Sequence, residues 1–141
     1  MRTTLLISTY NWEDALKIVL LSAHQQTIQP NEILIADDGS RTSTKKIIDV
    51  FSQKLNIKHV WHEDNGFQKT IILNKAIAQT NSDYIIQIDG DIIMHKNFIK
   101  DHISKAKKGQ FIHGSRVFLN KALTKKTLKN QHLYFSFFQQ F

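Results

Sequence analysis

Four short apolar runs recur along this chain, and each is followed by a longer segment in which apolar residues repeat at helical spacing. The runs occupy residues 3–8, 32–36, 57–62 and 84–89. Runs of this length, bounded by polar and turn residues, are typical of buried strands. Their alternation with helices predicts right-handed βαβ units. We therefore expect an α/β fold with a mostly parallel sheet and helices on both faces.

The helices are expected over residues 12–26, 40–54, 67–80 and 95–108, and a fifth strand over 110–119. Asn11 is expected to cap the first helix, with Asp14 completing a capping box. Helical spacing predicts which side chains face the core. They are Ala15, Ile18, Val19 and Ser22, then Leu73, Ala76 and Ile77, then Ile99, His102, Ile103 and Ala106.

Polar residues follow each of the four runs at the point where the strand should end. In open parallel sheets a ligand lies beyond the carboxyl ends of the strands. The strand ends are expected at Ser8, Asp37, His62 and Asp89, grouped along one edge of the sheet. The segments to examine for chemistry are residues 8–11, 37–40, 63–66 and 89–91.

Asp89 and Asp91 flank a glycine at the end of the run YIIQID. On an extended chain residues two apart point to the same side, so both carboxylates can converge on one point. Such a pair repels itself unless a cation or a proton joins it, and a hard divalent cation fits oxygen ligands. Gly90 leaves room for a ligand to approach the backbone. The alternative is a plain turn after a strand.

Length and composition limit the classes of protein. The 141 residues suffice for one domain with a core, no apolar run is long enough to span a bilayer, and cysteine is absent. The N-terminus does not resemble a signal peptide. The formal charge of +7 suits a polyanionic partner or a solvated lysine-rich surface. From residue 96 onward Asp101 is the only acid, against Lys96, Lys100, Lys105, Lys107, Lys108, Arg116, Lys121, Lys125, Lys126 and Lys129.

The stretches ISTYNWEDAL, ILIADDGS and ILNKAIAQTNSDYIIQIDGDIIMHKNFI together resemble the family 2 glycosyltransferases. EDNGFQKTIILNKAI and HGSRVFL resemble the branch that acts in bacterial polysaccharide and lipopolysaccharide synthesis. The resemblance extends from Thr3 to about Leu119. It implies the GT-A fold, in which a Rossmann-like nucleotide-binding half precedes an acceptor-binding half. Each motif alone is weak, but their order, each at an expected strand end, makes the set specific.

The resemblance assigns the nucleotide pocket. Ser8 and Tyr10 are similar to residues that line the nucleobase pocket, although Tyr10 also suits a core position. Asp38 matches the aspartate that accepts a hydrogen bond from the uracil imide N–H. Asp37 is expected to have a structural role in the turn, and a purely structural turn at ADDGS is the alternative for both acids.

The resemblance also implies a metal-assisted donor site. Lys69 lies where the family often has a basic residue near the nucleotide, and a solvated helix lysine is the alternative. Asp89 is similar to the first acid of the D-x-D motif, near the ribose and the metal. Asp91 is similar to the direct ligand of Mn²⁺ or Mg²⁺. The metal would neutralise the diphosphate and stabilise it as a leaving group.

The implied reaction transfers a sugar from a nucleotide sugar, a UDP-sugar by preference, to a glycan or glycolipid acceptor with inversion. In the family a second half supplies the acceptor pocket and a catalytic acid that acts as base. No acid follows Asp101, so we expect residues 1–118 to form the donor-binding domain. Residues 119–141 would be a basic and aromatic tail that begins a missing acceptor half. The isolated chain is then expected to transfer little sugar.

The tail carries Phe135, Phe137, Phe138 and Phe141, which suggests self-association or a missing core. A cytoplasmic location is expected, and peripheral contact with the inner membrane is left open.

Two other classes compete. A haloacid-dehalogenase-type phosphatase also uses D-x-D, but after the first strand of its domain and with a different following residue. A basic nucleic-acid-binding module suits the lysines, yet no nucleic-acid motif is present, so nucleic acid is not an expected partner. A dinucleotide-binding domain would need glycines after the first strand. The histidines are too scattered for a zinc site, and His95 is expected to be structural rather than near the metal.

Overall fold

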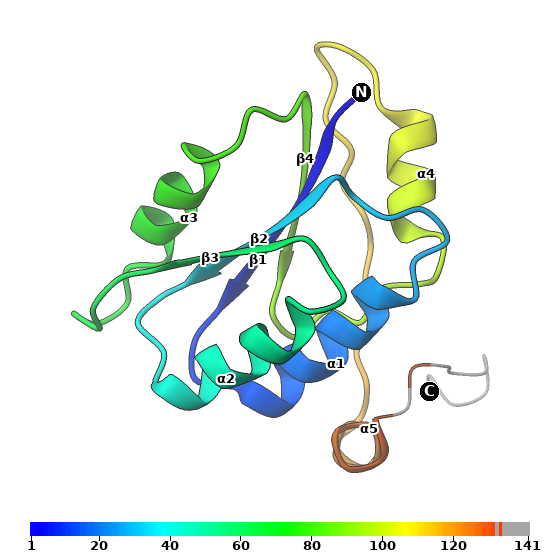
Figure 1. The fold of residues 1–141 in the computed structure, drawn as a ribbon. Coiled ribbons are helices and arrows are strands. Elements are labelled where there is room, and N and C mark those ends of the chain that lie inside the picture. The colour runs from blue at the N-terminus through cyan, green and yellow to red at the C-terminus, as the bar shows by residue number, and fades with distance from the viewer. Residues whose placement is uncertain (132, 134–141) are drawn as a thin grey trace.

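A computed structural model describes residues 1–131 and 133 of the chain. Four parallel strands form one sheet in the order β3-β2-β1-β4 (Figure 1). The strands are β1 (Thr3–Thr9), β2 (Glu32–Asp37), β3 (Ile57–Trp61) and β4 (Tyr84–Asp89). The helices are α1 (Glu13–His24), α2 (Thr42–Phe51), α3 (Lys69–Ile77), α4 (Phe98–Lys105) and α5 (Lys121–Asn130). The expected α/β fold with a parallel sheet is confirmed.

Helices cover both faces of the sheet, as the continuous apolar runs predict. Successive residues of β1 alternate between two cores: Leu5 and Ile7 pack with α1, α2 and α4, whereas Leu6 packs with α3. Figure 1 shows α3 on one side of the sheet and α1, α2 and α4 on the other. The side chains of Leu5, Leu6 and Ile7 are fully buried. This two-sided burial holds the central strands, and therefore their carboxyl ends, in fixed positions.

The inward-facing stripes are largely as expected, with one error in α3. Ile77 is 39% exposed, while Ile72, which the sequence analysis left out, is fully buried beside Ala76. Ile72 and Ala76 are four residues apart and therefore lie on one face of a short helix. Ile77 lies at the end of that helix, where the buried stripe has already turned away from it.

The expected N-cap at Asn11 is wrong. The helix begins at Glu13 after Trp12, and no side chain caps it. Asn11 adopts a left-handed backbone conformation with φ 44°, which asparagine tolerates better than most residues. Its side-chain oxygen accepts a hydrogen bond from the N–H of Arg41, and its own N–H donates to the hydroxyl of Ser40. Asn11 thus joins the loops that follow β1 and β2.

The expected strand at 110–119 is also wrong, because these residues join no sheet. Phe111, Val117 and Phe118 are exposed, so the segment lacks the buried face that would hold it in register. It runs from α4 to α5 (Figure 1). Asn120 caps α5 by accepting a hydrogen bond from the N–H of Leu123.

Helix α5 packs against α1 and buries Thr127. The boundary proposed at residues 118/119 stays a prediction. The aromatic cluster at residues 135–141 lies outside the described residues. Among the residues that the structure describes, no helix has both the length and the apolar composition to cross a bilayer.

A buried carboxylate stabilises the end of the sheet opposite the strand carboxyl ends. Glu32, at the start of β2, is 1% exposed. It accepts hydrogen bonds from the hydroxyls of Thr80 and Thr4 and pairs with Lys58, whose Nζ lies 2.9 Å from Oε2. The hydrogen bond from Thr80, with Lys58 and Thr4, outweighs burial and lowers the pKa of Glu32 from 4.5 to about 2.

This pKa predicts how stability depends on pH. A carboxyl group whose pKa falls on folding stabilises the protein above its unfolded pKa, and the contribution is lost as pH falls towards its folded pKa. The loss should therefore extend from about pH 4.5 to about pH 2. At about 1.4 kcal/mol per pKa unit it amounts to about 3 kcal/mol. Urea unfolding measures this loss. Between pH 5 and pH 2 the free energy of unfolding should fall by about 3 kcal/mol less in Glu32→Gln than in the wild type.

Asp49→Asn is the matched control. Asp49 forms an exposed pair with Lys45 on α2 and should change stability by no more than about 0.5 kcal/mol at any pH. Equal losses in wild type and Glu32→Gln would show that Glu32 does not carry this pH dependence.

Candidate functional site

The carboxyl ends of the strands meet at one edge of the sheet, as the sequence predicts. Ser8 of β1 lies opposite Asp89 of β4, and Thr9 lies opposite Asp37 of β2. Asp37 in turn lies opposite Trp61 of β3. The loops that follow β1, β2 and β4 are therefore neighbours in space, although Ser8 and Asp89 are 81 residues apart.

These loops, with the start of α3, enclose a pocket of about 270 Å³, which we call the edge pocket. All six residues that the sequence analysis assigned to a nucleotide or metal line it: Ser8, Tyr10, Asp38, Lys69, Asp89 and Asp91. The sequence analysis did not assign Trp12, Phe67 or Ile72, which also line the pocket. Trp12 and Phe67 lie in the loops that follow β1 and β3, and that position was the available signal.

Asp89 is held by two neighbours. Its Oδ1 accepts a hydrogen bond from the hydroxyl of Ser8 at 2.9 Å and lies 2.5 Å from Nζ of Lys69. Burial raises the pKa of Asp89, but the hydrogen bonds from Lys69 and Ser8, with the charges of Lys69 and Arg116, lower it below its usual value. Asp89 is therefore an anion at neutral pH, and Lys69 is not simply a solvated helix lysine.

Asp91 lies just beyond β4 and is exposed. Its carboxylate has no hydrogen bond or ion pair within the described part of the chain. No group of three or more His, Cys, Asp or Glu side chains suited to a metal occurs among the described residues. A cation here would be held by Asp91 and Asp89 alone, which leaves its other coordination positions for water and phosphate oxygens. The oxygen donors present fit Mg²⁺ or Mn²⁺ in that mode.

The two adjacent aspartates of ADDGS point to different partners. Asp37 is buried, accepts a hydrogen bond from the N–H of Ser40 at 2.8 Å and lies 2.8 Å from Nε2 of His59. Its expected structural role in the turn agrees with these contacts. Asp38 contacts Nε2 of His62 at 2.7 Å and accepts a hydrogen bond from the N–H of Gln68 at 3.0 Å. Asp38 also lines the edge pocket, so these bonds fix a carboxylate at its wall.

Aromatic side chains form the rim of the edge pocket. Tyr10 is 52% exposed, Trp12 48% and Phe67 89%, so Tyr10 is not the core aromatic that was its alternative. The hydroxyl of Tyr10 donates a hydrogen bond to Asp64 at 2.9 Å, which orients its ring. Exposed aromatic rings beside a polar pocket offer flat faces on which a base or a sugar can stack.

Gly90 lines the edge pocket and also has a role in strand packing that the sequence did not suggest. A Cβ at Gly90 would lie 2.8 Å from the carbonyl oxygen of Ser8 and 3.3 Å from the side chain of Thr9. The position of the missing Cβ is thus filled by β1, while Gly90 itself remains at the wall of the edge pocket. Glycine allows β4 to lie close to β1 where the two aspartates emerge.

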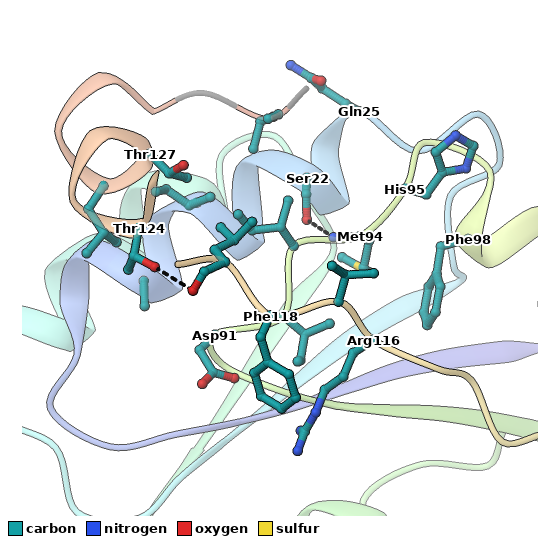
Figure 2. A pocket seen from close by; sticks show the side chains of 18 of the residues that line it. Ser22, Gln25, Asp91, Met94, His95, Phe98, Arg116, Phe118, Thr124 and Thr127 are labelled. Carbon is teal, nitrogen blue, oxygen red and sulfur yellow. Dashed lines mark hydrogen bonds between the residues drawn. The ribbon is translucent and has the colours of Figure 1, made fainter. Parts of the chain in front are cut away.

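A second, larger cavity of about 690 Å³ adjoins the edge pocket, and we call it the outer cavity (Figure 2). The two share Trp12 and Asp91. Helix α1, residues 91–98, residues 115–119 and α5 form its walls. The sequence analysis placed no site here, because the walls come from segments that are far apart in the chain. His95 lines this cavity and not the edge pocket.

A parallel α/β sheet with acidic side chains and a pocket at its carboxyl edge defines a Rossmann-like α/β protein with its ligand site where such folds place it. The sequence model of glycosyl transferase family 2 matches residues 4–141. The chain belongs to this family, as its motifs suggested, and its fold is of the GT-A type. This membership favours the glycosyltransferase interpretation over the phosphatase and the nucleic-acid-binding module.

Individual relatives agree with this assignment. Chondroitin synthase of Escherichia coli is 30% identical over 101 residues, which is 71% of this chain and 15% of that protein. The crystal structure of S. aureus TarS 1-349 in complex with UDP-GlcNAc superimposes with a TM-score of 0.66 at 25% identity, over 83% of this chain and 38% of that TarS chain. A mannosyltransferase from Pyrobaculum calidifontis, in complex with GDP-Man and Mn²⁺, shares the fold, with a TM-score of 0.55 and 21% identity over 64% of this chain and 27% of that one.

Proposed function

We propose that this chain binds the nucleotide-sugar donor of a glycosyltransferase that uses a UDP-sugar and a divalent cation. The single observation that supports this most is the edge pocket, whose walls contain all six residues assigned from the sequence. The UDP-GlcNAc in TarS and the Mn²⁺ in the mannosyltransferase are in keeping with this donor and cofactor. The chain spans only 15% of the chondroitin synthase it matches, so the activity of the whole protein is part of the proposal.

Different residues would contact different parts of the donor. Asp91 and Asp89 would hold Mn²⁺ or Mg²⁺, which neutralises the diphosphate and makes it a better leaving group. Lys69 lies beside Asp89, on the same side of the pocket. Asp38 would accept the uracil imide N–H, since a carboxylate has about four lone-pair sites and the two contacts to His62 and Gln68 leave some free. Tyr10 would stack on the base, and Ser8 keeps Asp89 in place.

The reaction proposed is inverting transfer of a hexose to a glycan or glycolipid acceptor. A base must take the proton from the attacking hydroxyl. None of the residues lining the edge pocket is assigned this role, and the choice among N-acetylhexosamine, galactose and glucose donors stays open. The cytoplasmic location and contact with a membrane remain predictions.

Calorimetric titration with nucleotides tests the proposal. UDP should bind more tightly than CDP, because Asp38 can accept a hydrogen bond from the imide N–H of uracil, whereas N3 of cytosine has no hydrogen to donate. Asp38→Asn should weaken UDP binding by about tenfold, the usual worth of a charge-assisted hydrogen bond, and reduce the preference over CDP. Thermal unfolding of the variant verifies that it is folded.

Asp49→Asn, an exposed change on α2, should bind UDP like the wild type. Equal binding of UDP and CDP by the wild type would reject the uracil assignment, and no binding of either would reject the donor site.

A further inference from the structure

We propose that His62 is a positioning residue that gives the edge pocket its preference for uracil over cytosine, because it holds the Asp38 carboxylate as a hydrogen-bond acceptor. This inference rests on the proposed function, since it takes Asp38 as the acceptor for the nucleobase. It adds a residue that does not itself line the edge pocket and to which the sequence analysis assigned no role in binding.

Strand β3 sets the direction in which the His62 side chain points. Val60, two residues earlier, is buried in one cluster with Ile72 and Ala76 of α3. Side chains two residues apart on an extended chain lie on the same side, so His62 should also face α3. Its contact with Lys75 of that helix agrees with this direction. The His62 side chain is only 10% exposed, so its position is fixed by the elements around it.

The contact with Lys75 decides which nitrogen of His62 carries a hydrogen. Nζ of Lys75 lies 3.3 Å from Nδ1 of His62. An ammonium group donates hydrogen bonds and cannot accept them, so Nδ1 is the acceptor and carries no hydrogen. The ring hydrogen is then on Nε2, which lies 2.7 Å from Oδ1 of Asp38. His62 therefore donates a hydrogen bond to Asp38.

Asp38 is held at both of its carboxylate oxygens. His62 donates to Oδ1, and the backbone N–H of Gln68 donates to Oδ2 at 3.0 Å. Asp38 is buried, yet it lines the edge pocket. A carboxylate that accepts at both oxygens has a fixed orientation and presents lone pairs, not a hydrogen, to a ligand. Such a group can accept the imide N–H of uracil but has nothing to donate to N3 of cytosine.

A second histidine–aspartate pair lies beside the first and provides an internal comparison. Nε2 of His59 lies 2.8 Å from Oδ2 of Asp37, and the N–H of Ser40 donates to the other oxygen of Asp37. Asp37 is 1% exposed and is not among the residues that line the edge pocket. The two pairs have similar chemistry, so the position of Asp38 at the pocket wall is what links His62 to the ligand.

Calorimetric titration of this chain with UDP and with CDP, both with Mn²⁺, tests the inference. The quantity compared is the ratio of the two dissociation constants. Partial misfolding of a variant weakens both nucleotides by the same factor, so it leaves this ratio unchanged. His62→Leu should lower the preference for UDP by about fivefold, the usual worth of one hydrogen bond. His62→Gln, whose amide can donate to Asp38, should keep the preference within about twofold of wild type.

Two controls separate this role from general loosening of the turn. His59→Leu breaks the neighbouring pair and should keep the wild-type preference, even if it lowers stability. In an Asp38→Asn background, His62→Leu should change the preference by less than about twofold, because His62 acts only through Asp38. Nitrogen NMR of the imidazole should find the hydrogen of His62 on Nε2 and none on Nδ1.

Three results would overturn the inference while a wild-type preference for UDP still supports the donor site. They are an unchanged preference in His62→Leu, an equal loss in His59→Leu, and a full additional loss when His62→Leu is combined with Asp38→Asn. A hydrogen on Nδ1 would also overturn it, because Lys75 could then not set the donor. Equal binding of UDP and CDP by the wild type would instead reject the uracil assignment itself, and this inference with it.

Discussion

Gly39→Ala is expected to abolish nucleotide binding and to lower the free energy of unfolding by about 2–5 kcal/mol. Gly39 follows Asp38 in the turn after β2 and has φ 91°, a conformation that side chains disfavour. A Cβ there would lie 2.6 Å from Cα of Asp64, inside van der Waals contact with the backbone of the next loop. Both loops border the edge pocket, so relieving the clash must displace Asp38 or the loop that carries Asp64.

Gly66→Ala provides the control. Gly66 also has a positive φ, 81°, but a Cβ there meets nothing within 4 Å. It should cost only the backbone strain, about 1–2 kcal/mol, and should retain UDP binding. Urea unfolding and UDP titration of both variants distinguish the cost of backbone strain, present in both, from the steric clash with Asp64, present only in Gly39→Ala. Equal effects of the two substitutions would show that the contact between the Gly39 turn and Asp64 is not important.

Asp91→Asn should remove the effect of metal on nucleotide binding. In the wild type we expect Mn²⁺ to tighten UDP binding by about a hundredfold, since a metal on a diphosphate contributes several kcal/mol and 1.36 kcal/mol is a factor of ten. Asp91 has no partner in the described residues and is exposed, so the substitution should leave stability unchanged. In the variant the UDP affinity with and without Mn²⁺ should agree within about twofold, because Asp89 remains paired with Lys69.

Asp101→Asn, an exposed acid on α4, should keep the full metal effect. The decisive comparison is calorimetry at equal ionic strength with Mn²⁺, with Mg²⁺ and with a chelator. A metal effect that survives in Asp91→Asn would assign the cation to other ligands.

Features that depend on the order of the strands and on local residue patterns were predicted best from the sequence. Buried strands in a βαβ arrangement fix where their carboxyl ends lie, so Asp38, Asp89 and Asp91 could be placed together before any coordinates were known. Prediction failed where a local signal competes with a distant contact. Asn11 and Asp14 form a reasonable capping pattern, but the side chain of Asn11 is used by Arg41, 30 residues away.

The segment 110–119 failed for a related reason. Its apolar residues have strand propensity, but a strand also needs a neighbour with which to form hydrogen bonds, and propensity cannot supply one. The outer cavity could not be predicted at all, because Trp12, Asp91, Arg116 and Thr127 meet only after the chain has folded. The role of Gly90 likewise depends on how closely β1 lies, which no pattern of residue types reports.

Because Lys69 already contacts Asp89, binding of the proposed metal and donor in the edge pocket would be an exchange of counterions rather than the filling of a bare acidic site. The ammonium group of Lys69 lies 2.5 Å from the Asp89 carboxylate and neutralises it. The repulsion between Asp89 and Asp91 is therefore reduced in the free protein. Asp89 would then be available to a divalent cation that binds together with a diphosphate. The displaced ammonium of Lys69 would then be free to pair with phosphate oxygens, so the net charge of the pocket would change little on binding.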